Sequence, residues 1–357
     1  MDRNRALVPL FDMHARKALP PLSVSLLALP ETTPAVLYNL YEVFLSVGVA
    51  WSELTGEEST ARRIVPRIVS RTRAPFPSAI GLPVTPQASL REVGQSDLVM
   101  VTDLTLPPGE TPCARWPEEA AWIREQFEGG ALVSSVCTGS LFLAEAGLLD
   151  DQPATTHWSA IGVFREHYPQ VQLAAERILC PAGPEHRIVT GGGAAAWEDQ
   201  ALYLIARFCG EAEARHIAKI FLLGDRSDGQ LSYAVMARPS QHADAIIAEC
   251  QAWIAEHYDK PHPVRHMIER SGLTERTFKR RFRAATGYTP VEYVQALRVE
   301  EAKQLLETED LSTEAVAHAV GYEDPVFFRH LFKRRTGTTP ARYRQRFQRL
   351  VPRKDAG

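Results

Sequence analysis

The chain has 357 residues, of which 45% are hydrophobic, and a formal net charge of −3, so it holds enough apolar material for two separate cores. Its longest apolar stretches, residues 20–30 and 131–137, are too short to cross a bilayer, and its first residues do not resemble a secretion signal. The five cysteines include no CxxC pair and no metal-ligand spacing to histidine. We therefore expect a cytoplasmic protein without membrane contact, disulfide framework, metal or cofactor.

The charge is divided unevenly along the chain. From residue 251 onward there are 20 Lys and Arg against 14 Asp and Glu, a net charge of +6, whereas the preceding residues carry 20 against 29, a net charge of −9. A basic C-terminal region beside an acidic body predicts that only the C-terminal part meets a polyanion such as nucleic acid.

Residues 22–223 alternate β-rich runs with amphipathic helical stretches. Three such pairs follow one another: strand 23–29 with helix 37–47, strand 98–101 with helix 118–127, and strand 131–136 with helix 140–149. This alternation predicts an α/β domain whose parallel sheet is flanked by helices, in a flavodoxin-like sandwich. Residues 1–21 are predicted to form an N-terminal arm, and residues 224–243, which contain many turn formers, a linker.

The region 244–350 has a helical pattern throughout and contains one motif twice. When the sequence is shifted by 50 residues, seven residues of the first copy fall on identical residues of the second: Phe278, Phe282, Thr286, Gly287, Thr289, Pro290 and Tyr293 on Phe328, Phe332, Thr336, Gly337, Thr339, Pro340 and Tyr343. Each copy predicts a short helix, a turn at Gly272 or Gly321, and a second helix, which together make a helix-turn-helix. We therefore expect an all-α C-terminal domain with two helix-turn-helix units.

Capping residues mark the ends of these helices. Thr274 is predicted to cap the second helix of the first unit, and Asp324, followed by Pro325, that of the second unit. The segment from Thr289 to Glu292 predicts a capping box that opens a further helix to about residue 308, with Val291 on its apolar side. Such a stiff connector would hold two recognition helices one DNA turn apart, roughly 34 Å.

The second helix of each unit carries cations around buried phenylalanines. These cations are Arg276, Lys279, Arg280 and Arg283 in the first unit and Arg329, His330, Lys333, Arg334 and Arg335 in the second. Cations at helical spacing can meet phosphates and guanine edges while the aromatic rings hold the helix to its domain. One such helix is typical of an ordinary amphipathic surface, but two copies in register predict binding to double-stranded DNA.

The segment from Gly321 to Arg344, GYEDPVFFRHLFKRRTGTTPARYR, resembles the signature of the AraC/XylS family of transcription regulators, and the resemblance covers about the last hundred residues. By position in that family, base reading falls to Arg276, Lys279 and Arg280 in the first unit and to Val326, Arg329 and His330 in the second. Thr274 and Lys333 complete our predicted DNA-binding set. His330 stands where many members have Arg, so we expect the second helix mainly to position phosphates. The resemblance implies a sequence-specific regulator, which we expect to be an activator that contacts RNA polymerase.

A second resemblance covers residues 22 to about 223. The segments VSSVCTGSLFLAEAGLLD, from Val133 to Asp150, and ATTHW, from Ala154 to Trp158, resemble the PfpI-type, class I glutamine-amidotransferase-like domain. Joined to an AraC module, this domain is similar to that of the GlxA-like regulators. In that superfamily a cysteine on a strained strand-to-helix elbow and a histidine about twenty residues on form a nucleophile pair, which here implies Cys137 and His157.

Two departures from the superfamily indicate that this pair is vestigial. Its enzymes place an acid six residues before the glutamate of the segment that here reads Leu40 to Phe44, and that position is Val36. The strand at 98–101 also runs into Thr102, Asp103 and Leu104 where those enzymes tend to have two glycines that donate to an oxyanion. We therefore expect no catalysis.

What remains is a sensor pocket at the carboxyl ends of the strands. We predict that a small metabolite binds there near Cys137, Thr138, His157 and Trp158. The resemblance to GlxA-like regulators implies an effector that contains nitrogen, and we expect a homodimer formed through the N-terminal domain. Two alternatives remain open: a Cys-dependent hydrolase or hydratase that keeps a DNA-binding module, and a regulator that senses oxidants through Cys137.

Overall fold

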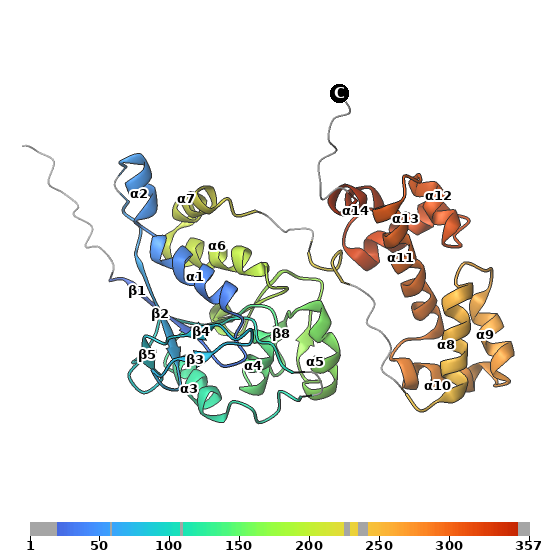
Figure 1. Ribbon diagram of the computed structural model, residues 1–357, viewed down its shortest axis with the longest axis horizontal. Helices are drawn as coiled ribbons and strands as arrows, with labels where there is room; N and C mark the ends of the chain where they lie inside the picture. Colours follow the sequence, from blue (N-terminus) through green and yellow to red (C-terminus); the bar gives the residue numbers. More distant parts are fainter. Residues whose placement is uncertain (1–19, 58, 108–109, 225–228, 235–241, 349–357) are drawn as a thin grey trace, which may run out of the picture. The chain divides into compact units, whose positions relative to one another are not determined.

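The computed structural model describes residues 20–57, 59–107, 110–224, 229–234 and 242–348, which form two compact units (Figure 1). Unit 1 comprises Met1–Thr156, Glu166–Leu173 and Leu179–Asp225; unit 2 comprises His157–Arg165, Ala174–Ile178 and Arg226–Gly357. The predicted arm lies largely outside the described residues, as do two stretches of the predicted linker, 225–228 and 235–241. The domain limits therefore stay predictions.

Unit 1 is built on a seven-stranded sheet with the strand order β10-β11-β7-β6-β1-β2-β5. Its strands are β1 (Leu22–Leu27), β2 (Ile64–Ser70), β5 (Ala88–Ser89), β6 (Leu98–Val101), β7 (Leu132–Ser135), β10 (Leu179–Ala182) and β11 (Ile188–Gly191). All neighbours are parallel except β10 and β11, which are antiparallel because a short connection joins them. The predicted parallel sheet is confirmed, with one antiparallel edge strand in addition.

Helices cover both faces of this sheet (Figure 1). On one face, α1 (Pro34–Ser46), α6 (Ala196–Cys209) and α7 (Glu211–Phe221) share a buried apolar cluster with the strands. On the other face lie α3 (Pro117–Glu128) and α4 (Gly139–Glu145). The remaining elements are α2 (Ala50–Thr55), α5 (Ile161–His167), the short turns η1 (Trp158–Ala160) and η2 (Pro184–His186), and the strand pairs β3 (Phe76–Pro77) with β4 (Pro83–Val84) and β8 (Pro153–Ala154) with β9 (Gln172–Leu173).

The C-terminal part of unit 2 is helical. Its helices are α8 (Ala245–His257), α9 (Pro263–Ser271), α10 (Glu275–Thr286), α11 (Pro290–Thr308), α12 (Thr313–Ala319), α13 (Pro325–Thr336) and α14 (Pro340–Phe347). The pairs α9–α10 and α12–α13 are the two predicted helix-turn-helix units. Helix α11 joins them, and its 19 residues measure about 28 Å at 1.5 Å per residue.

Each of the two helix-turn-helix units has its own buried core, and the repeated aromatic residues fill both cores in the same way. In the first core the rings of Phe282 and Tyr293 meet edge to face with centroids 5.3 Å apart. In the second core Phe332 and Tyr343 do the same at 5.5 Å. The sequence repeat is therefore a repeat of packing.

The repeated polar residues and glycines set the helix ends. Gly287 and Gly337 end α10 and α13 in the left-handed region, at φ 75° and 76°, where a side chain would be strained. Thr289 and Thr339 cap the following helices through their hydroxyl oxygens. The predicted capping box at Thr289 is present in full. These identities thus belong to the scaffold, not to the exposed faces of α10 and α13.

One prediction about α11 is wrong. Val291, which we expected on the apolar side of the helix, is 50% exposed. The buried side of α11 instead runs from Pro290 through Tyr293 and Val294 to Ala302 and Leu306. Val291 lies one position round the helix from Pro290, so it faces away from the core although it belongs to the first turn.

Arg298 of α11 is buried and ties the connector to both helix-turn-helix units. Its guanidinium donates to the backbone oxygens of Tyr258 at 2.7 Å and Lys260 at 3.0 Å, just before α9, and to that of Gly321 at 2.9 Å, between α12 and α13. It also lies over the ring of Tyr322, 4.8 Å from the centroid. A buried charge with all these partners holds its surroundings in one geometry.

Candidate DNA interface and candidate ligand site

The exposed face of α10 carries the residues predicted to bind DNA in the first unit. Arg276, Lys279 and Arg280 are all exposed, whereas Phe278 and Phe282 on the opposite side are buried. Lys279 forms an ion pair with Glu275 one turn earlier. The hydroxyl oxygen of Thr274 accepts a hydrogen bond from the backbone N–H of Thr277, which gives this predicted residue the capping role expected for it.

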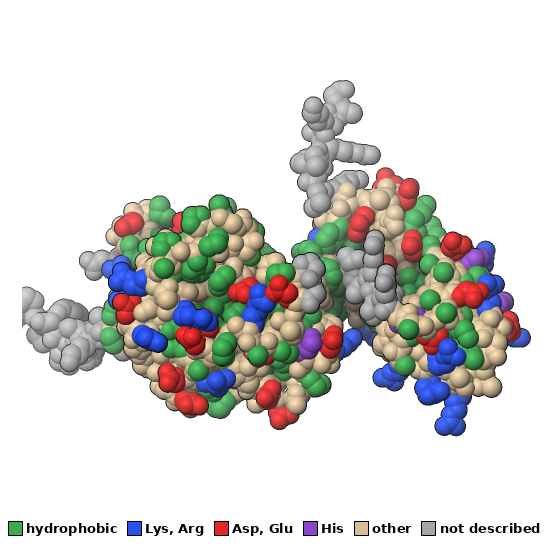
Figure 2. All heavy atoms as spheres, turned by 60° about the horizontal axis from the view of Figure 1, so that its bottom comes forward, with side chains coloured by type: hydrophobic (Ala, Val, Ile, Leu, Met, Phe, Trp, Pro, Cys, Tyr) green, Lys and Arg blue, Asp and Glu red, His purple; other side chains and the backbone are tan. Residues whose placement is uncertain are grey.

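The corresponding face of α13 carries the predicted residues of the second unit. Val326, Arg329, His330 and Lys333 are exposed and follow the spacing of one helix face. Arg329 forms an ion pair with Glu314 of α12 at 3.2 Å. Figure 2 shows Lys and Arg side chains projecting from the surface of unit 2. The structure therefore places the predicted residues on two exposed faces joined by α11, and their contact with DNA remains a prediction.

Cys137 lies on a sharp turn between β7 and α4. Its φ of 57° is in the left-handed region, and its side chain is 8% exposed. A Cβ at Gly139 would approach the backbone oxygen of Thr102 to 2.3 Å, so only glycine lets α4 begin this close to β6. Thr138 binds the segment that follows β6. Its hydroxyl donates to the backbone oxygen of Leu104 at 2.6 Å and accepts from the Leu104 N–H at 3.0 Å.

Two backbone donors near this elbow, those of Leu104 and Thr105, are occupied. The N–H of Leu104 is bonded to Thr138, and that of Thr105 to the backbone oxygen of Glu31 at 2.8 Å. An oxyanion hole requires free N–H groups aimed at the reacting atom, and these two have other acceptors. Val36, at the position of the missing acid, is buried in α1.

Sequence reasoning missed a carboxylate at the elbow. Asp103 follows β6 and is 8% exposed, and its Oδ1 has no hydrogen-bond partner among the described residues. Burial raises the pKa of this carboxyl and outweighs a hydrogen bond with Thr33, which lowers it. Burial, together with the negative charge of Asp103, raises the pKa of the Cys137 thiol to about 11. A signal was present in the sequence, because Asp103 lies two residues after the end of the apolar strand β6, and open α/β sheets bind ligands at the carboxyl ends of their strands.

His157 and Trp158 belong to unit 2, whereas Cys137 and Thr138 belong to unit 1. His157 caps η1, and its Nδ1 lies 2.6 Å from the hydroxyl of Ser159. Burial lowers its pKa, and its ring lies 4.9 Å from that of Trp158. The predicted nucleophile pair and the predicted four-residue ligand site therefore stay predictions.

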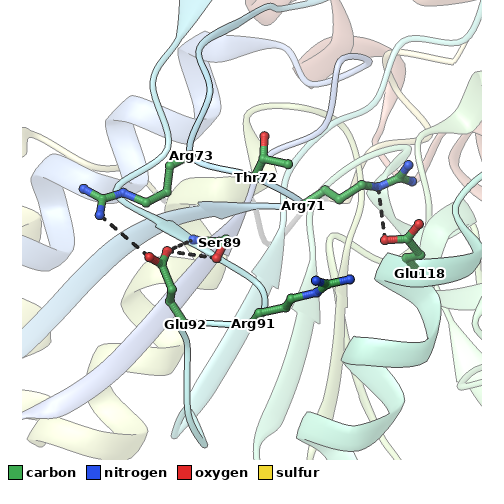
Figure 3. Close-up of a pocket in the computed structure, with 7 residues that line it drawn as sticks. All are labelled: Arg71, Thr72, Arg73, Ser89, Arg91, Glu92 and Glu118. Atoms are coloured by element: carbon green, nitrogen blue, oxygen red, sulfur yellow. Dashed lines mark hydrogen bonds and ion pairs between the residues drawn. The ribbon is translucent and has the colours of Figure 1, made fainter.

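Two hollows lie at the carboxyl end of β2. The first, of about 480 Å³, is lined by Arg71, Arg73, Arg91 and acidic residues (Figure 3). Arg71 pairs with Glu118 at 3.7 Å and with the buried carboxylate of Glu119 at 2.9 Å, so its charge is satisfied within the protein. In Figure 3 Arg71 and Arg91 extend towards Glu118, whereas Arg73 points away from them.

The second hollow, of about 330 Å³, extends from the end of β1 to the end of β2. It contains Trp116 and the ion pair between Glu31 and Arg115, whose atoms are 2.6 Å apart. Because the backbone oxygen of Glu31 holds Thr105, this space adjoins the loop that carries Asp103. It offers room for a small molecule at the sheet edge where open α/β folds bind ligands.

A two-part molecule follows from these features: an α/β unit with a ligand edge, and a basic module of two joined helix-turn-helix units, which is the architecture of a DNA-binding transcription regulator. Residues 267–346 match the helix-turn-helix domain family, and residues 45–200 match the DJ-1/PfpI family. The chain is 32% identical over 286 residues to the HTH-type transcriptional regulator CdhR of Pseudomonas aeruginosa, with 78% of this chain and 80% of that one covered. It therefore belongs to the AraC-type transcription regulators that carry a DJ-1/PfpI domain.

The chain is also similar to two further proteins. The HTH-type transcriptional regulator GlxA of Rhizobium meliloti is 27% identical over 222 residues, which covers 61% of this chain and 66% of that one. The crystal structure of an AraC family transcriptional regulator from Pseudomonas putida aligns with 56% of this chain and all of its own, at 18% identity and a TM-score of 0.45. Among the helices of the described residues, none has the length and apolarity to span a membrane.

Proposed function

We propose that this regulator is controlled by a small nitrogen-containing metabolite that binds at the carboxyl edge of the sheet in unit 1, and that it catalyses no reaction. The observation that carries the proposal is the buried carboxyl of Asp103 beside Cys137, with one oxygen that lacks a partner within the described residues. Burying such an acceptor without a hydrogen bond is costly, so a ligand that donates one to it gains binding energy.

The state of Cys137 favours binding over catalysis. With a pKa of about 11, only about one thiol in ten thousand is ionised at pH 7, and the thiolate is the nucleophile. The neighbouring backbone donors of Leu104 and Thr105 already have acceptors. In this proposal Cys137 and Thr138 form part of the wall of the effector site in unit 1, and a role for His157 and Trp158 stays a prediction from the sequence.

The effector's nitrogen would face Asp103. An ammonium group or an N–H donor supplies both a hydrogen bond and, when charged, a counter-ion for the buried carboxylate. Binding changes DNA affinity only if the effector binds one arrangement of the regulator more tightly than the other. In the cell we expect a cytoplasmic homodimer that activates transcription through contact with RNA polymerase.

Thermal shift measurements on the full chain test this proposal. The probes are primary amines, quaternary amines, amides and amino acids, each compared with a nitrogen-free alcohol or carboxylic acid of the same size. We expect a nitrogen compound to raise the melting temperature through linkage, by an amount that falls in Asp103→Asn but persists in Cys137→Ala. If no nitrogen compound exceeds its nitrogen-free match, the proposed effector class is wrong.

The same variants separate the alternatives. A hydrolase or hydratase would turn over a substrate, and Cys137→Ala would abolish the turnover. An oxidant sensor would lose DNA affinity after treatment with hydrogen peroxide in the wild type but not in Cys137→Ala. We expect neither result, because the neutral thiol is unreactive towards both substrate and peroxide.

A further inference from the structure

The two predicted recognition helices, α10 and α13, have the same buried and capping residues but expose different side chains. The exposed positions of α10 include Arg276, Lys279, Arg280 and Arg283, and 50 residues later those of α13 include Val326, Arg329, His330 and Lys333. None of the seven repeated identities falls on these positions. The most pronounced change is at the first of them, where an arginine in the first unit corresponds to a valine in the second.

The first turn of α13 exposes two adjacent apolar side chains. Val326 is 51% exposed and Phe327 is 48% exposed, and they follow the capping Asp324 and the first helical residue, Pro325. In the first unit the position equivalent to Phe327 is Thr277, whose hydroxyl forms a hydrogen bond with that of Thr274. The ring of Phe327 packs against Tyr322 at 5.7 Å between centroids, so it is held in place while half of its surface stays open.

The position of Val326 and Phe327 in the first turn of α13 limits which groups of the DNA they can contact. In helix-turn-helix proteins the N-terminal residues of the recognition helix contact base edges in the major groove. An apolar side chain cannot bond to the donors and acceptors of that groove, and the one apolar group there is the C5-methyl of thymine. Burying that methyl against Val326 or Phe327 removes apolar surface of both partners from water.

We propose that the second unit reads thymine by contact of Val326 and Phe327 with C5-methyl groups, whereas the first unit reads guanine through the guanidinium groups of α10. The inference rests on the proposed role of α13 as a recognition helix. Arg329, paired with Glu314 at 3.2 Å, and Lys333 lie further along the same face and meet phosphates. The operator is then asymmetric, with a G-containing half and a T-containing half.

The test replaces thymine by uracil, which deletes the methyl group and keeps every hydrogen-bonding atom. The full chain first selects a binding sequence from a random DNA library, and dissociation constants are then measured with each thymine replaced in turn. One or two replacements in one half-site should weaken binding about fourfold each, the value of one buried methyl-sized group. Replacements in the other half should have no effect.

Two variants assign the effect to its residues. Val326→Ala, which shortens a half-exposed side chain, should bind the thymine and uracil versions of at least one such position equally well. Phe327→Ala serves the same purpose at the neighbouring position, provided that its melting temperature equals that of the wild type. Arg276→Ala, the matched change in the first unit, should relax a guanine preference in the other half-site and leave the ratio between thymine and uracil unchanged.

The outcomes are distinct. If uracil is tolerated at every position, or if the preference for thymine survives in both Val326→Ala and Phe327→Ala, methyl reading by α13 is refuted. If the chain selects no sequence from the library over random competitor DNA, the proposed function fails instead.

Discussion

Two aspartates of unit 1 should respond to the same substitution with opposite signs. In Asp103 burial raises the pKa, so the carboxyl is protonated more readily in the folded protein than in the unfolded chain. In Asp97 burial opposes ionisation too, but hydrogen bonds from the backbone and hydroxyl of Ser23, both 2.7 Å long, and the charge of Arg62 outweigh it and lower the pKa. Asp103→Asn should therefore stabilise the protein at neutral pH, whereas Asp97→Asn should destabilise it.

The pH dependence follows from these directions. A raised folded pKa means that the wild type loses stability as the pH rises from the ordinary aspartate value of about 3.9 through the folded pKa of Asp103. The advantage of Asp103→Asn should therefore grow over that range and then level off. A lowered pKa means that the stabilisation by Asp97 is complete above about 3.9 and is lost only as the pH falls through its folded pKa. The deficit of Asp97→Asn should therefore be constant between about pH 5 and pH 8.

The magnitudes follow from the contacts. An unsatisfied buried polar group costs about 1–3 kcal/mol, and about 1 kcal/mol shifts the melting temperature of a domain of this size by roughly 2–4 °C. Asp103→Asn removes the buried charge but keeps a polar group in its place, so it should raise the melting temperature at pH 8 by only a few degrees, roughly 2–4 °C for each kcal/mol gained. The carboxylate of Asp97 is 39% exposed, so the loss of its hydrogen bonds is discounted for solvent screening to about 1 kcal/mol.

Tryptophan fluorescence on the full chain measures both effects. Trp51, Trp116, Trp122 and Trp197, four of the six tryptophans, lie in unit 1. Melting curves of the wild type and both variants are compared from pH 4 to pH 8.5. A stabilisation by Asp103→Asn that is the same at every pH, or a loss of stability in this variant at pH 8, would refute the assignment of a raised pKa and of a costly buried carboxyl.

Three other measurements test the rest of the structure. Iodoacetamide should modify the exposed Cys113 long before Cys137, whose rate should rise about tenfold for each pH unit up to its pKa of about 11; comparable rates at pH 7.5 would contradict a neutral buried thiol. Thr289→Ala should cost about 1 kcal/mol by removing the cap of α11, and NMR titration should show the pKa of Glu292, held low by hydrogen bonds from the backbone and hydroxyl of Thr289, return towards its ordinary range. Phe282→Ala should cost about 3–5 kcal/mol in denaturant unfolding, against less than about 0.5 kcal/mol for the exposed Val291→Ala; equal losses would contradict the described core.

The sequence predicted those features that are decided within a few residues. Caps at Thr274, Thr289 and Asp324, and the glycines that end α10 and α13, depend on local backbone bonds, so their positions could be identified directly. Arg298 was missed because its acceptors lie between 23 and 40 residues away in sequence. A charged residue on the buried side of an amphipathic helix is the signal that would have found it.

The ligand edge was predicted only in part for the same reason. The elbow at Cys137 follows from a strand, a cysteine and a small-residue turn that are adjacent in sequence. The closeness of Asp103 to that thiol depends on the pairing of β6 with β7, where Val101 lies beside Ser135. Strand order joins segments that are distant along the chain, and a single sequence does not disclose it.

The hydrogen bonds of Arg298 to the segments beside both helix-turn-helix units have a consequence for the spacing of the DNA half-sites that the protein can bind. Because Tyr258, Lys260 and Gly321 are bound to one side chain, we expect the distance and rotation between the two helix-turn-helix units to adapt little to the DNA. One extra base pair between the half-sites turns the second by roughly 35° about the double helix. We therefore expect binding to weaken gradually with base substitutions inside a half-site, but sharply with an insertion or deletion between the half-sites.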